Sequence, residues 1–126
     1  MQTLWIGLAG ALGTVARYRL DTLVQGRLQG PFPCGTLLVN LLGSFLGAVL
    51  LYSALRGGSV SPAARLVLGT GFLGGFTTYS AFNSETLGYF LDGAPGRGAL
   101  YLAATVLGCL AAGGAGWLLA RALFAT

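Results

Sequence analysis

Several polar residues lie inside apolar stretches, at spacings that place them on one face of a helix. Thr36, Asn40 and Ser44 recur every four residues in one stretch, and Tyr101 and Thr105 repeat that spacing in another. Residues four apart lie on the same side of a helix. Because a polar side chain in lipid is costly and normally faces the bundle interior or water, this pattern predicts that these faces mark a pathway.

The hydroxyl groups also have a plainer interpretation. Serine and threonine in membrane helices often bond to carbonyl groups of their own helix. Asn40 is harder to explain in this way, because a carboxamide carries two donor hydrogens and an acceptor oxygen. We therefore expect Asn40 to line a wet space.

Two charged residues, Glu85 and Arg17, are also candidates for chemistry. Glu85 lies near the end of an apolar stretch, where it is either a proton-coupled carboxylate or an acid held by hydrogen bonds. Arg17 follows a long apolar run, deeper than a simple flank requires. It is either a lipid anchor or the mouth of an anion path.

The stretch GFLGGFTTYSAF, residues 71–82, predicts an interrupted helix near Gly74 and Gly75. Irregular backbone at membrane depth is tolerated only where it lines a cavity or binds an ion. Free carbonyl oxygens would suit a hard cation. Free amides and the hydroxyl groups of Thr77, Thr78 and Ser80 would suit an anion.

Tyr79 and Phe82 are three residues apart and therefore share a face just after the interruption. Such a pair is commonly ordinary packing. The ring edges are electropositive, however, so edges turned toward a path would bind an anion weakly. A channel needs weak binding, because a tightly held ion would enter and not leave.

The composition predicts the elements that position these residues. The chain of 126 residues is 55% hydrophobic and 8% charged, and its charges leave four long uncharged runs. A bilayer core about 30 Å thick needs about 20 helical residues. We therefore predict one all-α membrane domain, residues 1–126, with four transmembrane helices at about 3–24, 34–55, 63–91 and 98–123. The third is broken mid-membrane near 74–78, and Gly57–Gly58 contributes to the turn before it.

The arginines barely orient this chain in a membrane. With four spans, one side holds three arginines and the other holds four, namely Arg56, Arg65 and Arg121 against Arg17, Arg19, Arg27 and Arg97. The positive-inside rule then gives little bias. We expect either an antiparallel homodimer with dual topology, whose twofold axis lies in the membrane plane, or a single orientation set by Arg17 and Arg19.

Several function classes are disfavoured. The sequence has no histidine and no Cys/His cluster for metal chemistry, and Cys34 and Cys109 fit small packing residues inside apolar runs. Scattered arginines fit membrane flanks better than nucleic-acid binding, although the sequence pI is about 9.6. We expect no enzyme, because no nucleophile and base are paired.

Three motifs resemble the Fluc, or CrcB-type, fluoride channels, and the resemblance covers most of the chain. They are GTVARY at 13–18, GTLLVNLLGSF at 35–45, and GFLGGFTTYSAF at 71–82 followed by Glu85. The last motif is long and chemically unusual, so it is the specific one.

The resemblance implies a dual-topology homodimer in the cell membrane that conducts fluoride passively through two pores and so lowers its toxicity. Backbone carbonyls of Gly74 and Thr77 from both chains would hold a central structural sodium ion. Arg17 would lie in a vestibule. The fluoride pathway would comprise Thr36, Asn40, Tyr79, Ser80, Phe82, Glu85, Tyr101 and Thr105.

Two positions depart from the family pattern. The family most often has phenylalanine at Tyr79, so this chain adds a hydroxyl group that needs a partner. It usually has threonine at Ala81, so one hydroxyl group of the expected path is missing.

Two other functions compete with this interpretation. A small proton-coupled multidrug or cation antiporter of dual topology would make Glu85 central. A structural subunit without transport is favoured by small residues at four-residue spacing, such as Gly43 with Gly47, and Gly108 with Ala112 and Gly116. The structural subunit explains neither Asn40 nor the broken third helix.

Overall fold

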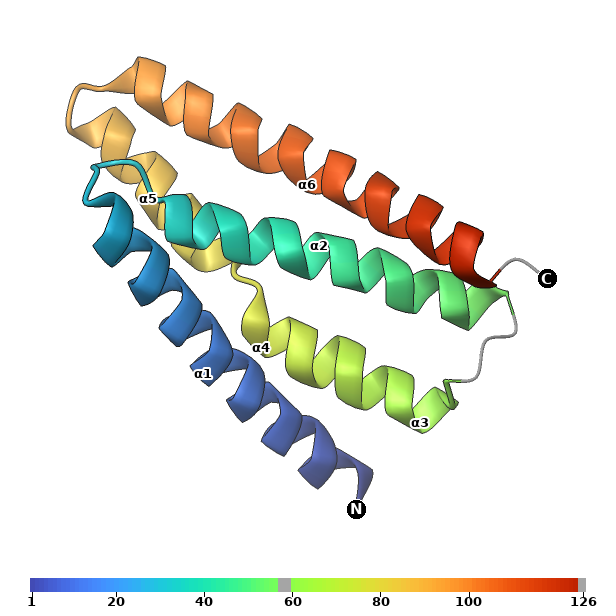
Figure 1. The fold of residues 1–126 in the computed structure, drawn as a ribbon. Coiled ribbons are helices and arrows are strands. Elements are labelled where there is room, and N and C mark those ends of the chain that lie inside the picture. The colour runs from blue at the N-terminus through green and yellow to red at the C-terminus, as the bar shows by residue number, and fades with distance from the viewer. Residues whose placement is uncertain (57–59, 125–126) are drawn as a thin grey trace.

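The computed structural model describes residues 1–56 and 60–124, and every regular element in these ranges is a helix (Figure 1). The long helices are α1 (Gln2–Leu28), α2 (Cys34–Leu55) and α6 (Pro95–Phe124). The part of the chain between α2 and α6, called here the third helical stretch, is divided into α3 (Pro62–Arg65), the π-helix η1 (Leu66–Leu73), α4 (Gly74–Phe76) and α5 (Tyr79–Leu91). The predicted all-α class is confirmed. The predicted turn at Gly57–Gly58 lies outside the described residues.

Helix α1 continues to Leu28, past its expected end at residue 24. Gln29 then adopts a left-handed conformation, with φ 45° and ψ 27°, and its N–H donates to the Gln25 carbonyl. The Gln25 side chain donates to the carbonyls of Gly30 and Phe32, at 2.7 and 3.2 Å. The helix therefore ends at a C-cap and a bonded turn, because charged residues on its surface do not stop it.

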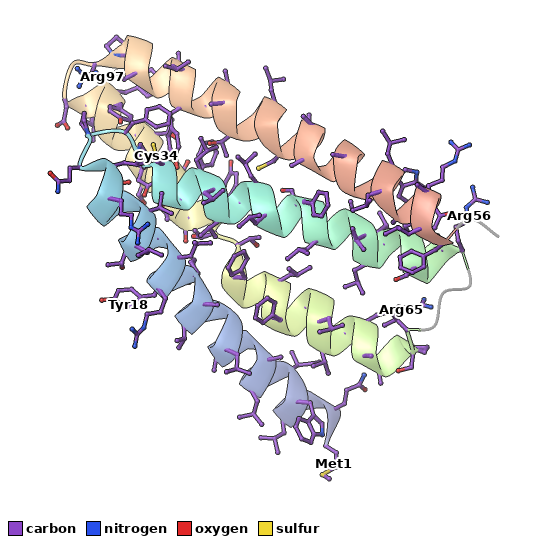
Figure 2. All side chains as sticks on the ribbon, in the orientation of Figure 1. Met1, Tyr18, Cys34, Arg56, Arg65 and Arg97 are labelled. Carbon is purple, nitrogen blue, oxygen red and sulfur yellow. The ribbon has the colours of Figure 1, made fainter. Side chains whose placement is uncertain are left out.

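Apolar side chains cover the outer faces of the long helices. Trp5 on α1 and Leu118 on α6 are among many that are more than half exposed. Figure 2 shows Arg97 at one end of the bundle and Arg56 and Arg65 at the other. By length and composition, α2 and α6 are each able to cross a membrane. Apolar surface of this extent marks a membrane protein.

Close helix packing positions the interior. Helix α2 lies along α6, and α1 lies against η1 and α4 (Figure 1). Gly116 on α6 meets α2 where a Cβ atom would collide with the Phe45 carbonyl oxygen. Gly75 meets the Gly10 carbonyl of α1 in the same way. These glycines let backbones approach closely, as small residues do between membrane helices.

Thr77 and Thr78 interrupt the third helical stretch. Thr77 has φ −81° and ψ 158°, Thr78 has φ −148° and ψ 112°, and this extended pair separates α4 from α5 (Figure 1). Gly74 is helical, with φ −62° and ψ −37°. The interruption thus lies within the predicted range of 74–78, at its C-terminal end and just after the glycine pair. The physical reason is that Gly75 serves the close contact with α1.

We expect Gly116→Ala to destabilise the protein by about 1–3 kcal/mol, because the added methyl group meets backbone atoms of Phe45. Gly114→Ala is the matched control, since nothing lies within 4 Å of its Cβ position. Alanine there should stabilise the helix by up to about 1 kcal/mol. Unfolding in detergent, followed by circular dichroism, compares the two. Equal stability of both variants would contradict this packing.

Candidate functional site: a polar strip beside a groove

Asn40 and Thr78 bind each other through two hydrogen bonds. Asn40 Nδ2 donates to the Thr78 carbonyl at 3.0 Å, and the Thr78 N–H donates to Asn40 Oδ1 at 2.8 Å. Both residues are buried. The carboxamide therefore satisfies both backbone groups of an extended residue, much as a neighbouring strand would. The Asn40 side chain therefore stabilises the separation of α4 from α5, because neither backbone group of Thr78 is left unpaired.

The same bonds release two carbonyl groups from the helix. In a continuous helix, the Thr78 N–H would donate to the Gly74 carbonyl and the Ala81 N–H to the Thr77 carbonyl. Here the Thr78 N–H donates to Asn40, and the Ala81 N–H donates to the Thr78 hydroxyl at 3.1 Å. The carbonyl oxygens of Gly74 and Thr77 therefore lose their helical donors. Oxygens of this kind suit a hard cation.

The Glu85 carboxylate accepts hydrogen bonds from two other helices. The Thr36 hydroxyl on α2 donates to Oε1 at 2.8 Å, and the Tyr101 hydroxyl on α6 donates to Oε2 at 2.6 Å. Thr36 and Tyr101 are buried and Glu85 is half-buried. One carboxylate thus joins α2, α5 and α6, and both of its oxygens are engaged.

A row of aromatic rings leads from the surface to this carboxylate. The ring centroids of Tyr79 and Phe82 are 5.7 Å apart at an interplanar angle of 66°, and those of Phe82 and Tyr101 are 5.4 Å apart at 64°. Tyr79 is 77% exposed, whereas Phe82 and Tyr101 are buried. In such edge-to-face pairs, the electropositive edge of one ring points toward the electronegative face of its neighbour.

Two recesses flank Thr78. An open groove of about 900 Å³ follows α2 between the third stretch and α6. Predicted site residues line it, namely Asn40, Gly74, Thr77, Tyr79, Phe82 and Thr105. A second pocket of about 310 Å³ is lined by Arg17, Thr36 and Glu85 on the side of α1. Thr78 borders both.

The structure places the remaining predicted residues near the same point. Ser80 Oγ lies 3.2 Å from Thr78 Oγ1 and shares a hydrogen bond with it. Thr105 Oγ1 is buried and has no hydrogen-bond partner in the described part of the chain. A buried hydroxyl group without a partner is a place where a bound ion or water would be stabilised.

Sequence reasoning underrated Thr78. The sequence predicted a hydroxyl group for an anion, and the structure shows in addition that this hydroxyl group caps α5 and that the Thr78 backbone binds Asn40. A signal was present, because threonine is a preferred residue immediately before a helix. Asp21, which also lines the smaller pocket, was missed altogether.

Metal-binding side chains are not grouped in this structure. Residues 1–56 and 60–124 contain no set of three or more His, Cys, Asp or Glu placed to hold an ion. Cys34 and Cys109 are free thiols. The carbonyls of Gly74 and Thr77, which lack their helical donors, are backbone oxygens of the kind that a hard cation binds.

The hydrogen-bonded groups of the interior form a polar strip, whose residues are Thr36, Asn40, Thr78, Ser80, Glu85 and Tyr101. This strip and the apolar outer faces of the helices together define the class. This is a small all-helical membrane protein that holds hydroxyl, amide and carboxylate groups between two recesses.

The chain belongs to the CrcB family. Its residues 4–117 match the family described as "CrcB-like protein, Camphor Resistance (CrcB)". It is 47% identical over 121 residues to the fluoride-specific ion channel FluC of Sorangium cellulosum, covering 96% of this chain and 95% of that protein. Identity to FluC of Anaeromyxobacter dehalogenans is 52% over 119 residues, covering 94% of each. Identity to FluC 2 of Moorella thermoacetica is 42% over 124 residues, covering 98% and 100%. The resemblance inferred from the motifs is confirmed.

We expect Tyr101→Phe to destabilise the protein by about 1–3 kcal/mol, because one oxygen of the Glu85 carboxylate loses its donor. Tyr79→Phe is the matched control at an exposed ring and should change stability by less than about 0.5 kcal/mol. Thermal unfolding in one detergent measures both. A Tyr101→Phe variant as stable as the control would show that Glu85 does not depend on this bond.

Proposed function

We propose that this chain is a passive, fluoride-selective channel of a prokaryotic inner membrane, which lets fluoride leave the cytoplasm and so reduces its toxicity. The observation that carries the proposal is that relatives matching nearly the whole chain are each named fluoride-specific ion channels. The polar strip supplies a physical reason. Fluoride is small and strongly hydrated, so a path must replace its water shell with donor groups.

The fluoride pathway would begin in the groove. Asn40 and the unpartnered hydroxyl group of Thr105 offer donors there. The ring edges of Tyr79 and Phe82 add weak attraction for an anion without binding it tightly. Ser80 would continue the path beside Thr78. The hydroxyl group of Tyr79, where the family most often has phenylalanine, lies on the exposed side of this row.

Beyond the rings the path would reach the Glu85 carboxylate. The hydroxyl groups of Thr36 and Tyr101 both donate to it. An anion at this point competes with Glu85 for the same two donors, and like charges repel. The carboxylate therefore has to release a donor before fluoride can take it. Arg17, which lines the pocket beside Glu85, would attract the anion into the vestibule.

Glu85 also favours a second candidate function. It is the carboxylate to which the polar strip leads, as a proton-coupled antiporter for drugs or other cations would require. The relatives' names favour the channel, and the two candidates differ in whether transport needs a proton gradient.

A structural sodium ion fits the released carbonyls of Gly74 and Thr77. Both lose their helical donors, and both residues border the groove, where a second chain could approach. Two carbonyls from each of two chains would provide four oxygen ligands. The ion would supply fixed positive charge at the centre of the assembly.

An antiparallel homodimer would cover the open groove. The near-equal division of arginines between the two ends removes the usual bias in orientation, so copies could insert both ways. A twofold axis in the membrane plane would place the Gly74 and Thr77 carbonyls of both chains together and duplicate the pathway, giving two pores. Each chain would cross the membrane four times, with the third helix broken near mid-membrane.

Purified protein in liposomes loaded with potassium fluoride should release fluoride rapidly once valinomycin removes the charge imbalance. Because the proposed pathway needs no proton coupling, efflux should not require a pH gradient. A fluoride-selective electrode follows the release, and chloride-loaded liposomes serve as the control. Efflux that depends on a proton gradient, or transport of an organic cation instead, would favour the antiporter.

Phe82→Ile should abolish fluoride efflux while leaving the assembly intact, because the buried ring edge in the pathway is lost. Phe90→Ile is the matched control on the same helix, since Phe90 is 47% exposed and lines neither recess. Efflux and size-exclusion chromatography are measured for both variants. Normal efflux through Phe82→Ile would remove this ring from the pathway.

A further inference from the structure

One peptide group carries both an oxygen of the proposed cation site and a donor to Asn40. The carbonyl of Thr77 and the N–H of Thr78 belong to the same planar, conjugated amide. The carbonyl has lost its helical donor, and the N–H donates to Asn40 Oδ1 at 2.8 Å. Whatever draws electrons toward the Thr77 oxygen therefore makes the Thr78 N–H a stronger donor.

The Asn40 carboxamide continues this chain of polar groups. Its oxygen accepts from the Thr78 N–H, and one Nδ2 hydrogen donates to the Thr78 carbonyl at 3.0 Å. Because both ends are bound to one residue, the carboxamide cannot rotate without breaking two hydrogen bonds. A second Nδ2 hydrogen remains, and Asn40 lines the groove. That hydrogen is the donor available to an anion.

We propose that the Thr77–Thr78 peptide and the Asn40 carboxamide form a relay of two amides, through which a cation at the Thr77 carbonyl strengthens the remaining Asn40 N–H as an anion donor. Hydrogen-bonded amides polarise one another, and a low dielectric increases the effect. The relay rests on the proposed function, which supplies both the cation at one end and the anion at the other. It assigns to Asn40 a positioning role and an anion-binding role in the same side chain.

The relay differs from a role of Asn40 as a simple cap of the interruption. A cap would hold the backbone in place whether or not a cation were present. A relay couples the two sites energetically, and such coupling is reciprocal. Sodium should raise the affinity for fluoride, and fluoride should raise the affinity for sodium.

The sequence allows this coupling to be observed in the unmodified protein. Thr77–Thr78 is the sole pair of consecutive threonines, so carbonyl-¹³C and ¹⁵N labelling of threonine yields one cross-peak that reports this peptide. Asparagine occurs at positions 40 and 83 alone, so ¹⁵N-asparagine labelling yields two side-chain amide pairs. Asn83 is exposed on α5 and serves as an internal control. Asn83→Asp removes its signal and assigns the other pair to Asn40.

The experiment compares labelled protein reconstituted throughout in sodium or in the bulky cation N-methyl-D-glucamine, at equal ionic strength. In sodium, the amide proton of Thr78 and one Nδ2 proton of Asn40 should both move downfield, whereas the Asn83 protons stay in place. Fluoride added to either sample should move the same Asn40 proton. Its half-saturation concentration should be lower in sodium by about fivefold or more.

Three results would overturn the relay, and they separate it from the proposed function. If the Thr78 proton responds to sodium but the Asn40 protons do not, the cation site stands and the relay fails. If neither responds, the cation site fails as well. If fluoride half-saturation is equal in both cations while liposomes still release fluoride, the channel stands and the coupling is absent.

Discussion

The reciprocal hydrogen bonds between Asn40 and Thr78 are the interaction on which the rest of this structure depends. A chain that leaves its helix inside a bilayer exposes amides and carbonyls that cost several kcal/mol each if unpaired. Asn40 satisfies both backbone groups of the extended residue. The chain can therefore remain extended at Thr77 and Thr78, with the carbonyls of Gly74 and Thr77 freed from their helical donors and α5 starting from its own threonine cap.

Close packing and polar bonding both hold the helices together. Gly75 brings the third stretch against α1, and Gly116 brings α6 against α2, so backbones approach without intervening side chains. Elsewhere along α2 and α6, the hydroxyl groups of Thr36 and Tyr101 reach the Glu85 carboxylate of α5. Each of these hydroxyl groups would otherwise be a buried donor without a partner. Close glycine contacts and buried hydrogen bonds therefore both join the helices, at different places along them.

Sequence patterns predicted some local features well and others poorly. The four-residue spacing of Thr36 and Asn40 correctly predicted an interior face of α2, because helix geometry places such residues on one side. The end of α1 was placed too early, since it is set by a capping turn that hydropathy does not reveal. The predicted interruption at 74–78 contains the extended pair Thr77 and Thr78. The sequence did not show which residues in that range leave the helix, because glycine is both a helix breaker and a packing residue.

The sequence by itself determined the class and the family of this protein. Uncharged runs long enough to cross a bilayer, and motifs with an unusual succession of residue types, are properties of the chain in order. The tertiary structure alone decided which polar groups pair. That Asn40 binds the backbone of Thr78, 38 residues away, and that Glu85 binds Thr36 and Tyr101, depends on how helices pack. Hydrogen bonds form over about 3 Å between groups far apart in sequence, so spacing along the chain cannot select the partner.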